Sequence, residues 1–131
     1  MRILATLLAT LLAGSAHAAS LQDYELNRQL NEVARQSSVG TPRAINADLL
    51  DNGYSVDGHR LINHIAVRPA HAAQMRGNPD AVRQQLAASV CANPGYRQLL
   101  QRGAELVYAF SEYQSERPVT RERFVAADCG L

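Results

Sequence analysis

The sequence predicts an α+β fold, a two-layer sandwich with helices on one face of an antiparallel sheet of about four strands. Apolar residues recur with helical spacing in residues 21–36 and 79–102, and the side chains of residues 59–67 and 104–113 divide between the two faces of extended strands. Turn-forming residues separate these segments and set the order α-β-β-α-α-β-β. Helices and hairpins in this order are typical of helices packed on one face of an antiparallel sheet.

The first 18 residues have the pattern of a secretory signal peptide. Met1-Arg2 is positively charged, an apolar run follows, and small residues lead to an A-x-A site ending at Ala18. The run is too short for a membrane anchor, which needs about 20 residues. We therefore expect cleavage between Ala18 and Ala19, export to the periplasm or the medium, no integral membrane segment afterwards, and a single domain over residues 19–131.

The charge balance excludes several classes of function. The chain has 13 basic and 12 acidic residues, and every basic residue is an arginine. A chain so balanced has no overall attraction to nucleic acid or to an anionic membrane. Because lysine is absent, chemistry that uses a lysine nucleophile or a Schiff base is excluded.

Residues 21–36 predict the first helix. Leu26, Leu30 and Val33 form one apolar stripe, and Ser20 is suited to cap the N-terminus. A narrow stripe on a polar helix is typical of packing at the edge of a domain. A helix that binds a partner is the alternative.

Residues 44–67 predict the first hairpin. One strand covers residues 45–55 with an interruption near Gly53, and a second covers residues 59–67 after a turn at Asp57-Gly58. Both faces of the second strand are rich in apolar residues, which favours a position inside the sheet.

Two Asn-Pro pairs predict two consecutive helices. Asn78-Pro79 begins a helix over residues 79–92, and Asn93-Pro94 begins another over residues 94–102. Gly103 is a natural stop. Residues 69–77 are interpreted as a connector that can include one helical turn.

The last hairpin combines the clearest strand with a charged partner. In residues 104–113, Leu106, Tyr108 and Phe110 line one face of a strand, and residues 119–125 carry charges that suit an edge strand. Arg117, Arg121 and Arg123 on this hairpin form a candidate surface for an acidic partner. A merely solvated face is the alternative.

The two cysteines predict a disulfide. An exported chain with an even number of cysteines indicates pairing, and here only one intrachain pair, Cys91 with Cys129, is available. A reactive thiol or a metal ligand is the alternative. The chain has neither a CxxC redox motif nor a paired CxxC zinc motif.

No other pattern indicates catalysis, a cofactor or a metal. His59 and His64 are expected on opposite faces of one strand, so they cannot form a two-ligand site there. No GxSxG, HExxH, GxGxxG or P-loop motif is present. We therefore expect no enzyme, no cofactor and no metal. His64 with a nearby acid is the one general base that could be suggested.

The second half of the chain resembles a known family. The pattern VCxNxxxRxLLxxGxxLxYxF in residues 90–110, with Asp128-Cys129-Gly130, resembles small secreted bacterial proteins described as quorum-sensing-regulated virulence factors. The resemblance covers about residues 44–131 and not specifically the first helix. It implies an α/β sandwich with a signal peptide and a Cys91–Cys129 bridge, and it implies no catalytic residues.

These observations predict an exported, non-catalytic protein-interaction module, related to virulence or to the envelope, with a protein partner that binds the open sheet face or the edge of the last hairpin. The alternative is a carrier of a small ligand or lipid, with a pocket between sheet and helices near Tyr96, Tyr108 and Phe110. A sizeable apolar cavity at that place distinguishes the two.

Overall fold

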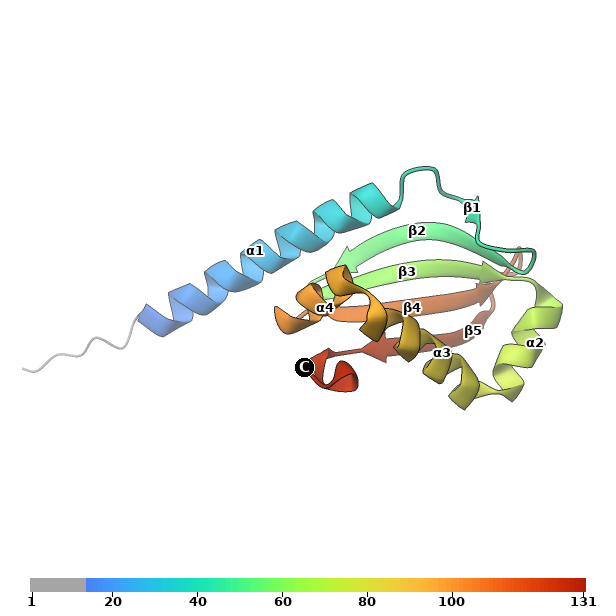
Figure 1. The fold of residues 1–131 in the computed structure, drawn as a ribbon. Helices are drawn as coiled ribbons and strands as arrows, with labels where there is room; N and C mark the ends of the chain where they lie inside the picture. Colours follow the sequence, from blue (N-terminus) through green and yellow to red (C-terminus); the bar gives the residue numbers. More distant parts are fainter. Residues whose placement is uncertain (1–13) are drawn as a thin grey trace, which may run out of the picture.

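A computed structural model describes residues 14–131, with side chains from Ser20 onward, as helices packed on a five-stranded sheet (Figure 1). The predicted signal peptide lies largely outside the described residues. The elements in chain order are α1 (Gly14–Ser37), β1 (Arg43–Ala44), β2 (Leu49–Asp57), β3 (Arg60–Val67), α2 (Pro69–Gly77), α3 (Pro79–Ala92), α4 (Pro94–Gln101), β4 (Glu105–Glu112), β5 (Pro118–Phe124) and the 3₁₀ helix η1 (Ala126–Cys129).

The sheet is mixed, so the prediction of about four antiparallel strands is wrong. Its order is β1-β2-β3-β4-β5, and β3 pairs with β4 in parallel while the other neighbours are antiparallel. The connection between β3 and β4 passes through three helices and returns the chain to the starting end of the sheet, which makes the next strand parallel. The additional strand, β1, has only two residues, which is too few for an alternating sequence pattern to predict it.

The helix α2 replaces the predicted connector. Pro69 occupies the first turn, and Ala72 and Met75 are buried against Ile65 and Phe110. Burial of one side of the segment stabilises a short helix whose sequence alone has little amphipathic pattern. The predicted order with two helices between the hairpins is therefore corrected to three.

The Asn-Pro starts of α3 and α4 lie where they were predicted, but only one asparagine caps its helix. Asn93 accepts a hydrogen bond from the backbone N–H of Tyr96 at 3.1 Å. Asn78 makes no such bond and donates to the carbonyl of Gln74 at 3.0 Å, so its side chain serves the end of α2 instead.

The core lies between one face of the sheet and the helices. Leu26 and Leu30 of α1 are buried with Leu61, and the stripe on α1 continues to Ala34 rather than Val33, which is half-buried. The buried side chains of α3, α4, β4 and β5 in this cluster are Val90, Leu99, Leu100, Leu106 and Phe124. A second cluster joins α2 to Ile65, Val67 and Phe110.

Both clusters use the same face of the sheet, so the helices lie on one side, as predicted. Figure 1 shows α3 and α4 crossing this face, with α2 at one end of the sheet. In the part of the chain that the structure describes, no helix has the length and apolar character needed to cross a lipid bilayer.

Candidate functional site

The face of the sheet opposite the helices is the candidate functional site. Strand alternation and register place a continuous set of side chains on it. We call this set the open face: Leu50, Ser55, Asp57, Arg60, Ile62, His64, Ala66, Glu105, Val107, Ala109, Ser111, Arg121 and Arg123. None of these residues belongs to the two core clusters, although Ile62, Ala66 and Val107 are themselves buried.

One end of the open face is a chain of ion pairs. Arg60 Nε lies 2.9 Å from Glu105 Oε2, and Arg123 Nη1 lies 3.3 Å from Glu105 Oε1. Arg60 also lies 3.8 Å from Asp57. The hydrogen bond from Arg60 is the main reason that the pKa of Glu105 is lowered. Two positive and two negative charges cancel here, and exposed pairs of this kind add little stability.

The open face carries a shallow hollow beside the turn between β4 and β5. His64, Ala109 and Arg121 form one row across β3, β4 and β5. The two small side chains Ala109 and Ser111 lie beside the larger His64 and Arg121, and the hollow they line with Val119 has a volume of about 380 Å³. His64 and Arg121 are exposed, whereas Ala109 and Ser111 are half-buried. The surface can therefore accept a side chain from another molecule.

His64 is hydrogen-bonded to a serine of the neighbouring strand. Its Nε2 shares a hydrogen bond of 2.6 Å with Ser55 Oγ. Within residues 20–131 no carboxylate forms an ion pair or hydrogen bond with His64, so the orienting acid of a catalytic triad is missing there. The acid suggested from the sequence is therefore not beside this histidine.

The other histidines are paired with acidic residues outside the open face. His59 Nε2 is 3.5 Å from Asp23, and His71 Nδ1 is 3.9 Å from Asp48. Among the described residues, no group of three or more side chains is arranged to hold a metal ion.

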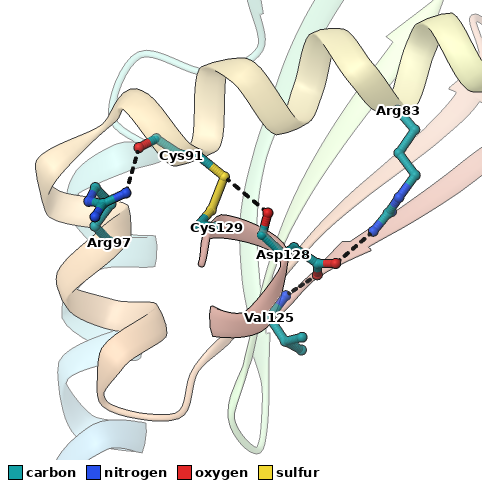
Figure 2. Close-up of a disulfide and its surroundings, with 6 residues drawn as sticks. All are labelled: Arg83, Cys91, Arg97, Val125, Asp128 and Cys129. Carbon is teal, nitrogen blue, oxygen red and sulfur yellow. Dashed lines mark hydrogen bonds and ion pairs between the residues drawn. A yellow bond between two sulfur atoms is a disulfide. The ribbon is translucent and has the colours of Figure 1, made fainter. Parts of the chain in front are cut away.

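The predicted cysteine pair forms a bridge between α3 and the C-terminus (Figure 2). Cys91 is bonded to Cys129 of η1, and their Cα atoms are 5.3 Å apart. Next to the bridge, Asp128 accepts hydrogen bonds from the N–H of Val125 at 2.7 Å and from Arg83 at 3.3 Å. The bridge and the bond from Arg83 attach the last residues to α3, and the bond from Val125 fixes the start of η1, so the role is structural.

The three candidate arginines separate in the structure. Arg121 and Arg123 lie on β5 in the open face, whereas Arg117 lies in the turn before β5, where its carbonyl accepts a hydrogen bond from the N–H of Glu112 at 2.8 Å. Arg123 pairs with Glu105. Arg121 has no ion pair or side-chain hydrogen bond with any described residue, which distinguishes it from Arg123. The predicted cleavage residues Ala18 and Ala19 lie within α1.

The interior near the tyrosines holds no pocket for a ligand. The void among Tyr54, Tyr96 and Tyr108 has a volume of about 10 Å³, which is at most the size of one water molecule. The hydroxyls of Tyr54 and Tyr96 are 3.4 Å apart, and burial raises the pKa of Tyr54 and of Tyr108 above the ordinary value. The alternative of a carrier with a pocket at this place is therefore wrong.

Sequence reasoning missed a buried polar network beside this void. Asn63 is 6% exposed and donates to Asp51 Oδ1 at 3.0 Å and to the carbonyl of Gly53 at 3.2 Å. The N–H of Gly53 donates to the same oxygen of Asp51 at 2.8 Å. This network holds the bulge between Asp51 and Tyr54, where the sequence predicted an interruption. An asparagine on the otherwise apolar side of a strand is the signal that could have revealed it.

Comparisons with known proteins support the sequence resemblance. Residues 19–130 match the model of the family described as "Putative quorum-sensing-regulated virulence factor", so the match includes the first helix. A crystal structure of a protein from Pseudomonas aeruginosa, described as a "putative secreted protein", is 60% identical with a TM-score of 0.81. That match covers 83% of this chain and 96% of the other. No curated protein matches the sequence.

Two pilotins share the fold at low identity. The type 2 secretion system pilotin EpsS from Vibrio vulnificus is 14% identical with a TM-score of 0.71, and the match covers 84% of this chain and 96% of that one. The type II secretion system pilotin AspS from Vibrio cholerae is 16% identical with a TM-score of 0.67, and the match covers 86% of this chain and 99% of that one. At these identities the similarity shows the fold alone.

Proposed function

Because the chain belongs to the family described as "putative quorum-sensing-regulated virulence factor", we propose that it is an exported, non-catalytic protein-interaction module of the bacterial envelope, which binds a partner protein on its open face. The sheet face that the helices do not pack on is the observation that carries this proposal. In residues 20–131, both buried clusters lie on the helix side, while the other side presents a hollow with exposed polar residues around it. A sheet face of this kind offers area for a second protein.

Four observations support export and a place in the envelope. The first 18 residues have the pattern of a secretory signal, and Cys91 and Cys129 are joined in a disulfide, which is typical of exported proteins. The 60% identical protein from Pseudomonas aeruginosa is described as secreted, and the fold is shared with pilotins of the type II secretion system. A role beside an envelope assembly fits these observations together.

The open face is a better docking surface than the edge of β5. Arg76 donates to the carbonyl of Pro118 at 2.8 Å, and Arg83 donates to the carbonyl of Arg123 at 3.1 Å. These guanidinium groups already occupy backbone acceptors of the edge strand, so an added strand would have to displace them.

Cross-linking in the exporting cell tests the proposal. A photoreactive residue is placed at Ala109 in the open face, and a matched one at Ala88, which is exposed on α3 on the helix side. We expect illumination to give a protein adduct of defined mass from position 109 and none from position 88. The absence of any adduct from position 109, with the protein exported and folded, would contradict the proposed function.

A further inference from the structure

Arg121 is the one arginine of the open face whose charge is not compensated. Arg60 and Arg123 share Glu105, and Arg60 also lies near Asp57, so that group of four residues is neutral. One row further along the sheet, Arg121 lies beside Ala109, and beyond Ala109 comes His64, which is bonded to Ser55. No carboxylate within residues 20–131 is paired with Arg121.

This guanidinium stands at the wall of the hollow. Ala109 and Val119 give the hollow an apolar lining, and Arg121 and His64 border it with polar atoms. Glu116 lines the hollow as well and carries the opposite charge. A ligand with both an apolar and an acidic group would therefore be oriented, since its acidic group is attracted by Arg121 and repelled by Glu116.

We infer that the open face recognises a segment of a partner protein that places a carboxylate on Arg121 and an adjacent apolar side chain in the hollow beside Ala109. This inference rests on the proposed function and specifies the chemistry of its partner. Arginine binds carboxylates through two parallel hydrogen bonds, and arginine is enriched among residues that dominate binding energy. A carboxylate would also supply the missing counter-charge.

The same observations argue against a polyanion as the occupant. Nucleic acid and anionic lipid surfaces bind through several cations at once. The open face offers only Arg121 without an ion pair among the described residues, and the whole chain has nearly equal numbers of basic and acidic residues. One cation next to an apolar hollow fits an acidic side chain with an apolar neighbour.

Selection from a random dodecapeptide phage library on the mature exported protein tests the inference. We expect enriched peptides in which Asp or Glu adjoins Leu, Ile, Met or Phe. With a synthetic peptide of the enriched sequence, the backbone amide signals of Ala109, Ser111 and Arg121 should shift in the NMR spectrum. Arg121→Ala should weaken its binding by about tenfold, and Arg121→Lys should weaken it less, because the charge remains while the paired hydrogen bonds are lost.

The matched control is Arg28→Ala. Arg28 is an exposed arginine on α1, where it contacts Glu25, and its replacement should leave peptide binding unchanged. A second variant, Ala109→Leu, fills the hollow and should weaken binding while Arg121 remains. Circular dichroism establishes that each variant is folded.

Four outcomes would overturn the inference: no enriched peptide, enriched peptides without acidic residues, equal binding to Arg121→Ala, or amide shifts confined to the helix side. Binding of anionic phosphatidylglycerol vesicles in place of any peptide would also overturn it. If Ala109 cross-links to a protein in the cell while the peptide result is negative, the proposed function stands and the inference on partner chemistry fails. The reverse result, peptide binding without a cross-link, would contradict the proposed function and, with it, the inference that the face binds a partner protein.

Discussion

At the scale of single residues, Gly53 shows how one position determines the shape of a strand. It lies at the bulge of β2, its φ is +97°, and it is buried. A Cβ atom at this position would lie 3.1 Å from both Ser38 Oγ and Thr41 Oγ1. The residue therefore has to adopt a left-handed backbone and also allow close approach of the loop that follows α1.

Replacement of Gly53 by alanine is expected to lower the free energy of unfolding by about 1–3 kcal/mol, because the backbone conformation and the close oxygens both oppose a Cβ. Urea denaturation followed by circular dichroism measures the change. Gly77→Ala is the control: it lies at the end of α2, where an added Cβ would meet no atom within 4 Å, and we expect little change. An equal loss in both variants would contradict the explanation.

Asn63 illustrates a residue whose role depends on its surroundings. In the sequence it interrupts an apolar strand, and in the structure it is buried and donates two hydrogen bonds at the bulge. A buried amide without these partners would be costly. Asn63 can be buried because the bulge brings Asp51 and the carbonyl of Gly53 within hydrogen-bonding distance of its side-chain amide.

At the scale of elements, Arg76 attaches α2 to the strands beside it. Its Nη1 lies 2.6 Å from Glu112 Oε1, and its Nη2 donates to the carbonyl of Pro118 at 2.8 Å. The hydrogen bond from Arg76 is the first cause of the lowered pKa of Glu112, and a bond from Ser115 is the second. The contact links the helix that the sequence did not predict to the end of the sheet.

The stability of the protein should depend on Glu112 in acid. Because the folded state lowers the pKa of Glu112 below its ordinary 4.5, the contribution of the charged group is fully present above pH 4.5. It is lost as the pH falls through the lower pKa of the folded state. We expect Glu112→Gln to be less stable than the wild type at pH 7 and to lose less stability between pH 7 and pH 3, in thermal melts.

Glu116→Gln provides the comparison, since Glu116 is exposed and has no ion pair with a described residue. The difference between its melting temperatures at the two pH values should match that of the wild type. If Glu112→Gln shows the full wild-type loss in acid, the ion pair with Arg76 does not contribute as described.

The disulfide joins elements that are distant in sequence. Cys91 and Cys129 are 38 residues apart, and the bridge closes α4, β4 and β5 into one loop. Replacement of both cysteines by serine should lower the free energy of unfolding by about 4 kcal/mol, because the unfolded chain regains the freedom of that loop. Denaturation of both proteins, with and without reductant, measures this difference in the free energy of unfolding.

Reductant should lower the stability of the wild type and leave that of the double serine variant unchanged. The exposure of η1 to hydrogen exchange should increase in the double variant, because the bond between Arg83 and Asp128 then has to hold η1 to α3 without the bridge. A wild type that is equally stable under both conditions would contradict the expected role of the bridge.

At the scale of the whole molecule, α1 relates the predicted export signal to the fold. The helix runs from Gly14 to Ser37, so the predicted cleavage site between Ala18 and Ala19 lies in its first turns. The buried residues Leu26, Leu30 and Ala34 all follow that site. Removal of the first 18 residues would therefore leave the packed part of α1 intact.

Mass spectrometry of the exported protein should give a mature N-terminus at Ala19. Ala18→Leu should prevent cleavage and retain the longer form, because signal peptidase sites require a small residue at that position. Gln22→Leu, which lies beyond the site on the same helix, should be processed normally. A mature N-terminus at any other residue would place the boundary of the domain differently.

Local spacing made much of the fold predictable. Leu26 and Leu30 at helical spacing identify the buried side of α1, alternation identifies β3 and β4, and the Asn-Pro pairs identify the starts of α3 and α4. These features depend on backbone geometry over a few residues, which a single sequence expresses directly. The two cysteines likewise indicated the bridge, since an exported chain with two cysteines has one intrachain partner for each.

The candidate site was predictable only in part. Arg121 and Arg123 were identified from the charged hairpin, but nothing in the sequence separates the compensated Arg123 from the uncompensated Arg121. That difference arises because the parallel pairing of β3 with β4 brings Arg60 beside Glu105, and Glu105 then binds Arg123 as well. His64 and Ala109 become neighbours of Arg121 through the same pairing.

The sequence by itself therefore determined which segments are helices and strands, which of their sides are apolar, and which cysteines can pair. Tertiary structure alone decided that β3 and β4 run parallel, that residues 69–77 form a helix, and that one face of the sheet stays open. The physical reason is the distance along the chain between the residues that determine each feature. Helix and strand periodicity follow from neighbours along the chain, whereas strand pairing across a long connection depends on where three helices pack.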